Sequence, residues 1–376
     1  MSLSVRKGTS RSRDCALAAQ ELYDAIYQPG IKLAVFYCAP DFDLPELAAQ
    51  LHRRFGDLPM IGCTSAGEIT PLGYLAGSIT AFSLASEKLD AAIELVRLDP
   101  FDSTQARARV QAVVESLGER DGLPPNATDT FAFMLIDGLA MQEELVVSCV
   151  HEALLGIELI GGSAADDTNF AATHIYHGGH FHQNVAVVAV VRTGMPFVAF
   201  RTQHFVKSDQ RMVVTKADPA RRIVSEINGR PAGREFARLV GLEINELTPL
   251  IFATHPVVIR IGGQYFVRSI AKVNPDESLT FFCAIDEGIV LTIAKGVDMV
   301  ENLREAFDKV RTTIGPPQLV LGCDCILRRL EVDRSGIKDE VGRIFAENNV
   351  IGFATYGEQY NSMHVNQTFT GIAIGA

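Results

Sequence analysis

Side chains that donate and accept hydrogen bonds are densest near the end of the chain, in residues 356–368. A carboxyl group, several amides and an imidazole in one short segment offer what a pocket for a small polar ligand requires. The alternative is a loop whose side chains satisfy its own backbone, as asparagine commonly does. We favour the pocket, in which Glu358 would bind a cation. Its predicted lining residues are Tyr356, Glu358, Gln359, Asn361, His364 and Asn366.

A second polar segment, Gly62-Cys63-Thr64-Ser65-Ala66-Gly67-Glu68, follows an apolar run much earlier in the chain. Thr64, Ser65 and Glu68 are predicted to face the same cavity, and Gly67 would allow the backbone to approach a ligand closely. A strand-end turn capped by hydroxyl groups is the alternative interpretation.

An acidic pair and an arginine complete the predicted binding site. Asp166-Asp167 ends a third segment of this kind, and we include Asp167, although paired acids on a loop are usually solvated. A carboxylate on the ligand would need a cation, which arginine supplies with bidentate geometry. We prefer Arg268 over Arg221-Arg222 because Arg268 lies within an apolar alternating stretch.

Four histidines, at positions 174, 177, 180 and 182, surround a predicted hairpin turn at Gly178-Gly179. Strand alternation puts His180 and His182 on one face, where they could share a metal. Structural zinc usually takes four ligands, often thiolates, and no cysteine lies beside this cluster, so a solvated hairpin tip is favoured. Haem would need an axial side chain, for which His364 and these histidines are candidates, and a large apolar slot. Any haem would be non-covalent, because the sequence has no Cys-x-x-Cys-His motif.

An enzyme is the rival class of function. Cys63 or Ser65 as nucleophile, with His364 as base, could support acyl transfer by a hydrolase or transferase. The sequence has neither a Gly-x-Ser-x-Gly motif nor a metalloprotease motif. We therefore expect a binding protein and no enzyme.

Three repeats of strand, helix, strand, polar loop and strand position these residues. An isoleucine in the second strand of each repeat is followed seven residues later by an acid. The predicted pairs are Ile61 with Glu68, Ile160 with Asp167 and Ile351 with Glu358. Parallel strands joined by helices make an α/β fold, so we expect helix-covered mixed sheets with the ligand at the carboxyl ends of the strands. The predicted organisation is an N-terminal segment, 1–27, followed by domains 28–212 and 213–376.

The net charge of −11 and pI near 5.3 exclude nucleic acid and anionic membranes as primary partners. The longest aliphatic run, Val185–Val191, is shorter than the roughly 20 residues of a membrane span. The N-terminus lacks the apolar run of a secretory signal, and seven scattered cysteines indicate reduced thiols. Together these features predict a cytoplasmic protein.

The polar segments 62–68 and 357–368, with Ala217-Asp218-Pro219-Ala220, closely resemble the FIST family, in which a FIST-N domain precedes FIST-C. The resemblance covers residues 32–374 and implies a sensory module that binds a small ligand such as an amino acid. FIST domains occur alone or fused to histidine kinases, chemotaxis receptors and cyclic-di-nucleotide enzymes, so the resemblance implies a kinase or cyclic-di-nucleotide enzyme as partner. One subgroup binds haem and senses nitric oxide to regulate a kinase, and this chain is similar to it in size and layout.

Overall fold

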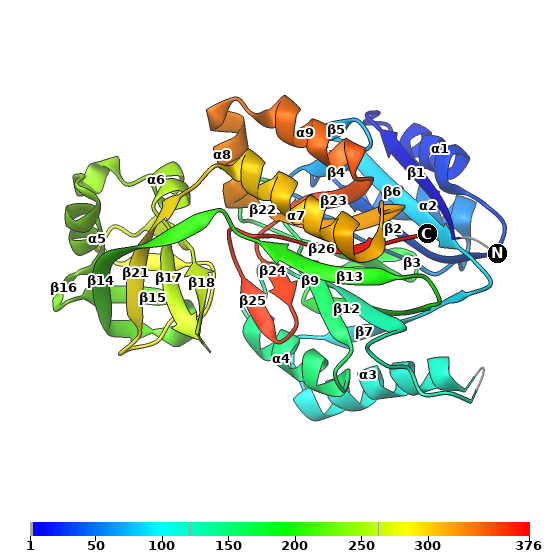
Figure 1. The fold of residues 1–376 in the computed structure, drawn as a ribbon, viewed down its shortest axis with the longest axis horizontal. Coiled ribbons are helices and arrows are strands. Elements are labelled where there is room, and N and C mark those ends of the chain that lie inside the picture. Colours follow the sequence, from blue (N-terminus) through cyan, green and yellow to red (C-terminus); the bar gives the residue numbers. More distant parts are fainter. Residues whose placement is uncertain (1–2, 120–121, 262) are drawn as a thin grey trace.

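The computed structural model describes residues 3–119, 122–261 and 263–376. Within them the chain forms a body of three six-stranded sheets and a smaller module, residues 205–296, at one end (Figure 1). The predicted α/β class with helix-covered mixed sheets is confirmed.

The first sheet follows the predicted repeat. Asp43 accepts a hydrogen bond from the Glu46 amide to begin helix α2, Pro45 occupies its first turn, and Gly56, at φ 59°, ends it. This helix joins two parallel strands, and the two other strands pair antiparallel on one side. The elements are β1 (Ser4–Ser10), α1 (Cys15–Ile26), β2 (Ile31–Cys38), α2 (Leu44–Phe55), β3 (Met60–Thr64) and β6 (Ile79–Ala85).

The second and third sheets repeat this order. Each has a parallel pair with an antiparallel strand beside it and a further strand outside. The second contains β7 (Leu89–Arg97), α3 (Ser103–Gly118), β8 (Thr130–Ile136), α4 (Glu143–Ala153), β9 (Glu158–Ser163) and β12 (Val185–Thr193). The third contains β13 (Phe197–Thr202), α7 (Met299–Ile314), β22 (Leu319–Cys325), α8 (Ile326–Ser335), α9 (Lys338–Glu347), β23 (Val350–Thr355) and β26 (Phe369–Ile374).

A short hairpin after the parallel pair of each repeat leaves its own sheet and completes another. The hairpin of repeat 1 pairs with β23, that of repeat 2 with β3, and that of repeat 3 with β9. The exchange is cyclic, so the body has approximate threefold symmetry. The hairpins are β4 (Glu68–Thr70) with β5 (Gly73–Leu75), β10 (Ile175–His177) with β11 (His180–His182), and β24 (Glu358–Tyr360) with β25 (Met363–Val365).

The hairpins correct the predicted alignment of the second repeat. Glu68 and Glu358 begin equivalent strands, but the residue in that place in repeat 2 is Ile175. Residues 166–174 are an extra loop before the hairpin, and Asp167 lies in it with φ 60°. The isoleucine-to-acid spacing therefore has structural meaning in repeats 1 and 3 but not in repeat 2.

The inner faces of the three sheets meet in one apolar core. Tyr37 and Phe353, from different repeats, stack with ring centroids 4.5 Å apart. Each fully buried side chain of this size contributes about 2–3 kcal/mol through the water-accessible area it loses. All seven cysteines are buried free thiols, which agrees with the prediction that they form no disulfide framework.

The module is a curved sheet packed around its own apolar core and bearing two helices. The predicted boundary at residue 212 falls inside β14, and the chain returns to the body after residue 296. None of the described helices is long and apolar enough to cross a bilayer. The module's elements are β14 (Phe205–Asp218), β15 (Ile223–Ile227), β16 (Arg230–Pro231), α5 (Ala232–Val240), α6 (Pro249–Thr254), β17 (Val257–Ile261), β18 (Gln264–Arg268), β19 (Ile270–Val273), β20 (Leu279–Phe281) and β21 (Val290–Gly296).

Candidate functional site

The polar loops at the carboxyl ends of the parallel strands meet, as the sequence predicts. They interlock through backbone hydrogen bonds: Ala165 N to Thr64 O (3.0 Å), Ala354 N to Gly67 O (2.7 Å) and Ser163 N to Gly357 O (2.8 Å). The side chains of the predicted site residues nevertheless point to different places, so the single predicted pocket divides into two.

The first place is an open cleft of about 310 Å³ lined by Ser65, Glu68, Asp167 and Arg329. Ser65 Oγ donates to Glu68 Oε1 (2.5 Å), and burial raises the pKa of Glu68 to about 7. Asp167 lies at the rim, where it accepts a hydrogen bond from Arg329 (3.1 Å). Thr64 faces elsewhere, because its buried hydroxyl accepts from the amide of His174.

Glu358 matches Glu68 in its contacts. Its Oε2 accepts from the amide (3.1 Å) and hydroxyl (2.6 Å) of Thr368, as Glu68 Oε2 does from the amide and hydroxyl of Ser78. Burial raises the pKa of Glu358 well above its ordinary value, because it disfavours the charged form of the carboxyl group. Glu358 therefore closes its own hairpin, and its environment is poorly suited to the predicted role of binding a cation.

The second place lies between hairpin β24–β25 and the module. Gln359 points to the face of β24 opposite Glu358 and is paired across the hairpin with His364. Its Nε2 donates to Ser163 Oγ (3.0 Å) and lies 3.4 Å from His364 Nδ1. Asn366 donates to the carbonyl of Tyr356 (3.4 Å). We call this group the interdomain polar cluster; it comprises Ser163, Arg268 with its chain neighbour Ser269, Gln359, His364 and Asn366.

Gly357 is needed where it stands beside this cluster. A Cβ atom there would lie 2.7 Å from His364 Nε2 and 2.9 Å from Asn366 Nδ2. The backbone of residue 357 therefore packs directly against the imidazole and amide groups. Burial lowers the pKa of His364 to about 4, so its ring is neutral at pH 7.

Within the described residues, five polar atoms of the cluster have no hydrogen-bond partner. Their residues are at most 7% exposed, whereas buried polar groups in proteins are nearly always paired. Donors and acceptors left unpaired in this way are suited to polar groups of a ligand. The atoms are Arg268 Nε, Ser269 Oγ, Gln359 Oε1, His364 Nε2 and Asn366 Oδ1.

Arg268, at the end of β18, brings a positive charge from the module to this cluster. Its Nη1 approaches the carbonyl oxygens of Val267 and His364, both at 3.4 Å, and it forms no ion pair with any described residue. Burying a guanidinium without an anion is unfavourable. The preference for Arg268 as the ligand's cation thus gains a structural basis, although its role remains a prediction.

A buried ion-pair network beside the cluster holds the module to the body. Arg222 donates to Glu143 (2.5 Å), to Glu144 (2.7 Å) and to the carbonyl of Phe282 (2.6 Å), while Ala284 N donates to Glu144 (2.6 Å). Burial raises the pKa of Glu143 to about 7. Burial alone would also raise the pKa of Glu144, but the interactions with His364 and Arg222 outweigh it and bring the pKa below its ordinary value. Sequence reasoning missed both acids, which look like ordinary first-turn residues of a helix.

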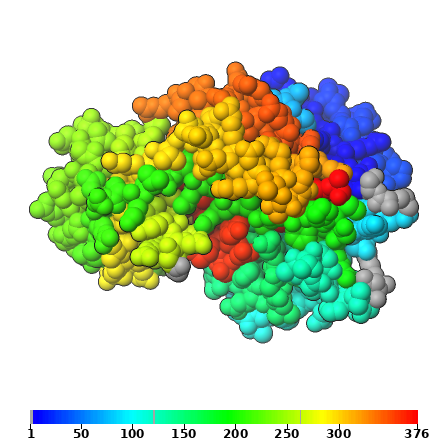
Figure 2. All heavy atoms as spheres, viewed as in Figure 1, coloured from blue at the N-terminus to red at the C-terminus, as the bar shows by residue number. Residues whose placement is uncertain are grey.

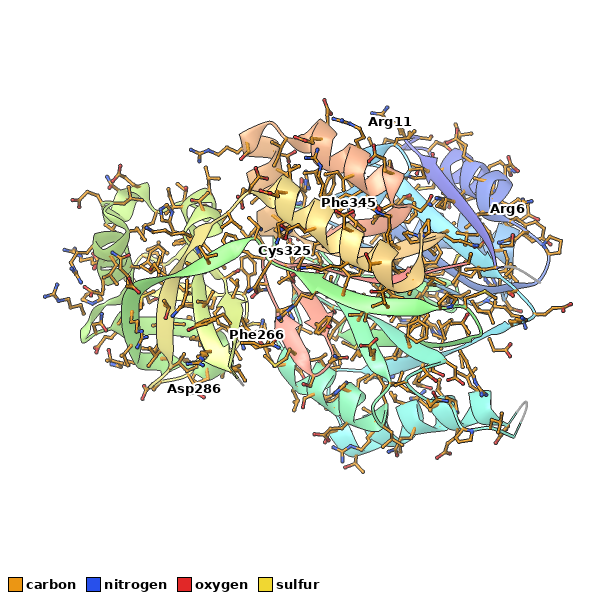
Figure 3. All side chains as sticks on the ribbon, viewed as in Figure 1. Arg6, Arg11, Phe266, Asp286, Cys325 and Phe345 are labelled. Carbon is orange, nitrogen blue, oxygen red and sulfur yellow. The ribbon has the colours of Figure 1, made fainter. Side chains whose placement is uncertain are left out.

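The hairpin itself lies at the junction of body and module. Figure 2 shows the red C-terminal segment between the yellow-green module and the teal part of the body. Figure 3 labels Phe266 at the edge of the module that faces this hairpin. The Arg201 guanidinium lies over the rings of Phe266 (4.6 Å) and Tyr360 (5.4 Å). Gln367 donates to the carbonyl of Ala253 in α6 (3.1 Å) and adds a further link.

Two other predicted residues have local structural roles. Asn361 is in the turn of the hairpin, at φ 52°, and its side chain accepts from the amide of Leu159. The ring of Tyr356 stacks on Phe170 at 4.6 Å, and its hydroxyl group bonds to Asp166. Tyr356 therefore contributes its backbone carbonyl to the cluster but not its hydroxyl group.

Neither predicted nucleophile is paired with His364. Cys63 lies in the central core, where burial raises the pKa of its thiol well above the ordinary value. Ser65 donates to Glu68 in the open cleft instead. The predicted arrangement for acyl transfer is therefore not assembled.

Two of the four histidines around Gly178-Gly179, His174 and His180, line a separate groove of about 850 Å³ between α2 and hairpin β10–β11. The hairpin turn is where the sequence predicts it. Among the described residues, no group of three or more His, Cys, Asp or Glu side chains could hold a metal ion. The groove is lined by Pro40, Phe42, Asp43, Leu44, Pro45, Ala48, Ala49, His52, Arg53, His174, Gly178, Gly179, His180 and Phe181.

Comparison with known proteins gives a clear family relationship. An uncharacterized protein of Methanocaldococcus jannaschii is 22% identical in an alignment 356 residues long that covers 83% of this chain and 67% of that protein. A cyanuric acid hydrolase from A. caulinodans covers 100% of this chain and 99% of its own, with 10% identity and a TM-score of 0.41. A second cyanuric acid hydrolase covers 99% of each chain, with 9% identity and a TM-score of 0.38.

Likeness at these TM-scores carries no argument about activity. The family models are informative: the FIST N domain matches residues 32–230 and the FIST C domain matches residues 232–361. FIST domains are sensory domains that bind small ligands in signal transduction. With these two matches over most of its length, the chain belongs to the FIST family.

Proposed function

We propose that this protein senses a small metabolite with a carboxylate group, of the amino-acid type or similar, bound at the interdomain polar cluster. The observation that carries the proposal is Arg268, a buried guanidinium without an anionic partner, surrounded by buried polar atoms that are also unpaired. A carboxylate would pair with Arg268 by charge-assisted hydrogen bonds. The amides of Gln359 and Asn366 would bind the rest of the ligand.

Such a ligand would bridge the module and the body, because Arg268 comes from the module and Gln359 and Asn366 from the body. The cluster is closed to solvent, so the module must move for the ligand to enter. A ligand that contacts both parts binds the closed arrangement better than an open one and shifts the equilibrium towards it. We propose that a histidine kinase or cyclic-di-nucleotide enzyme in the cytoplasm responds to this shift, and that the protein itself does not turn over its ligand.

Thermal-shift measurements with small carboxylate metabolites test this proposal. A ligand selective for the folded state raises the melting temperature by mass action. Arg268→Gln should abolish the shift, and Arg260→Gln, on the exposed part of neighbouring β17, should preserve it. A shift that survives in Arg268→Gln would place the ligand elsewhere and overturn the proposal.

A nitric oxide sensor with haem is a second candidate, favoured by the groove beside hairpin β10–β11. Haem needs an apolar slot and an axial side chain, and the groove combines Phe42, Leu44 and Phe181 with three imidazoles. His52, His174 or His180 would hold the iron, which supplies the nitric oxide site when haem is bound. His364 does not fit this role, because it is buried among the polar groups of the interdomain polar cluster and not beside a large apolar slot.

Titration of the purified protein with haem tests the second candidate. A Soret band that is lost in one of His52→Ala, His174→Ala or His180→Ala, but kept in His255→Ala in the module, would support it. The candidate is wrong if no Soret band develops, or if all three groove variants bind haem as the wild type does.

A further inference from the structure

The charges around the interdomain polar cluster are unevenly distributed. His364 has three charged groups as electrostatic neighbours: Glu144, Arg222 and Arg268. Glu144 and Arg222 already belong to one ion-pair network, and Arg268 belongs to none. His364 is itself neutral. The charged group that remains without an ion-pair partner among the described residues is therefore Arg268, a cation.

The carboxyl groups near the cluster are bound by other groups of the protein or point away from it. Both oxygens of Glu144 are engaged, Oε1 by the amide of Ala284 and Oε2 by Arg222. Glu143 also binds Arg222. Glu358 points to the opposite face of β24 and binds Thr368. Glu358 Oε1 has no hydrogen-bond partner, but its side chain lies on that opposite face, so the unpaired acceptors of the cluster are the neutral amide oxygens of Gln359 and Asn366.

From this arrangement we infer that the ligand is a carboxylic acid without an ammonium group: a 2-hydroxy or 2-oxo acid, and not the corresponding amino acid. This inference rests on the proposed function and narrows it. An ammonium group would be buried beside the unpaired Arg268, where like charges repel strongly because the local dielectric constant is low. It would find only neutral carbonyl groups in place of its lost hydration.

A hydroxyl or keto group fits the same position. A ligand hydroxyl can donate to Asn366 Oδ1 or Gln359 Oε1, and either group can accept from His364 in its Nε2-protonated tautomer. The carboxylate then pairs with Arg268. Such a ligand satisfies the unpaired atoms without bringing a second positive charge into the cluster.

Ligands with matched carbon skeletons test the inference directly. Calorimetry and thermal shift on the full-length protein would compare lactate and pyruvate with L-alanine, and malate and oxaloacetate with L-aspartate. We expect at least one hydroxy or oxo acid to bind about tenfold or more tightly than its amino analogue, since a misplaced buried charge costs at least this much. Tighter binding of the amino acids would overturn the inference but leave the proposed function intact.

Two variants sharpen the test by adding the missing anion. Asn366→Asp and Gln359→Glu each replace a neutral amide with a carboxyl group of nearly the same shape. Each should move the preference towards the amino acid by about tenfold, because an ammonium group then has an anionic partner. Unchanged preference in a variant that melts like the wild type would contradict the inference. If none of the six compounds binds the wild type, the proposed function fails at this site, and the inference fails with it.

Discussion

Three hairpins occupy equivalent places in the body, but their side chains differ in polarity. The cross-strand pair is Ile69 with Tyr74 in β4–β5, and Tyr176 with Phe181 in β10–β11. These pairs pack into apolar clusters with α9 and α2. The corresponding pair in β24–β25 is Gln359 with His364, which lies near α4 and the module.

This difference shows that the backbone arrangement does not require polar side chains here. Two hairpins are stable with apolar pairs, and the hydroxyl group of Tyr74 finds a buried partner in Asp324. Only the hairpin that meets the module carries unpaired polar atoms at this position. The polarity of β24–β25 therefore reflects its contact with the module and the ligand proposed between them.

Making an apolar hairpin polar should have the largest effect. Ile69→Gln removes a fully buried side chain and places an amide without partners among apolar residues. Lost burial and an unsatisfied amide should together lower the free energy of unfolding by about 4 kcal/mol. Urea denaturation measures this change. A loss below about 1 kcal/mol would mean that hairpin β4–β5 accepts a polar side chain at this position. The polarity of β24–β25 would then need no special explanation.

Buried carboxyl groups begin two of the hairpins and should make the stability of the protein depend on pH. Glu68 has an ordinary pKa of 4.5 when unfolded and about 7 when folded. Between these values the folded protein holds a proton that the unfolded chain has released, so stability falls as the pH rises from 4.5 towards 8. In Glu68→Gln, the decrease in the free energy of unfolding over this pH range should be smaller by up to about 3 kcal/mol.

Glu358→Gln tests the same linkage at the equivalent position of the third hairpin. Burial holds the pKa of Glu358 well above its ordinary value in the folded protein, so the folded protein keeps a proton that the unfolded chain releases above pH 4.5, as it does at Glu68. Unfolding at several pH values should show a flatter profile for each of the two variants than for the wild type. Equal slopes for the wild type and Glu68→Gln would contradict the prediction.

Disrupting the ion-pair network of Arg222, Glu143 and Glu144, which lies beside the third hairpin, should lower stability less than the changes above. Arg222→Ala leaves Glu143 and Glu144 without their cation, but proton uptake can neutralise part of the buried charge. We expect a loss of about 2 kcal/mol, less than for an uncompensated buried charge. Hydrogen exchange should also rise at the contact between α4 and residues 282–284. Arg221→Ala, which alters an exposed neighbouring arginine, should show neither change.

Making the polar hairpin apolar should have the smallest effect on the unliganded protein. Gln359→Leu removes one good hydrogen bond, to Ser163, together with an unpaired oxygen. These effects nearly cancel, so the free energy of unfolding should change by less than about 1 kcal/mol. The thermal shift by carboxylate ligands should nevertheless disappear. A large loss of stability would show that Gln359 has a structural role comparable to that of Ile69.

Much of the fold could be predicted from local patterns. Apolar runs gave β2, β8 and β22, amphipathic spacing gave α2, and Gly178-Gly179 gave a hairpin turn. Such features depend on neighbouring residues, so the sequence carries them directly. The repeat also indicated correctly that the polar loops would meet.

The division of the site could not be predicted, because it depends on pairing between distant segments. Asp167 matches Glu358 in spacing, but the loop that contains it displaces the hairpin and makes Ile175 the true counterpart. Strand alternation separates Glu358 from Gln359, yet only the structure shows that the Gln359 face meets the module. Nothing in the local sequence distinguishes the buried Glu144 from a solvated acid at a helix start.

The cyclic exchange of hairpins also sets an order for events on the ribosome. Every strand of the first sheet has been synthesised by residue 182, but hairpin β4–β5 must wait for β23, which begins at residue 350. The second sheet likewise stays open at its edge until β24 emerges. The exposed edge of β9 is a potential aggregation site during that interval. Residues 350–376 thus complete the edges that the earlier segments leave open, and a nascent chain stalled before them would be a natural target for chaperones.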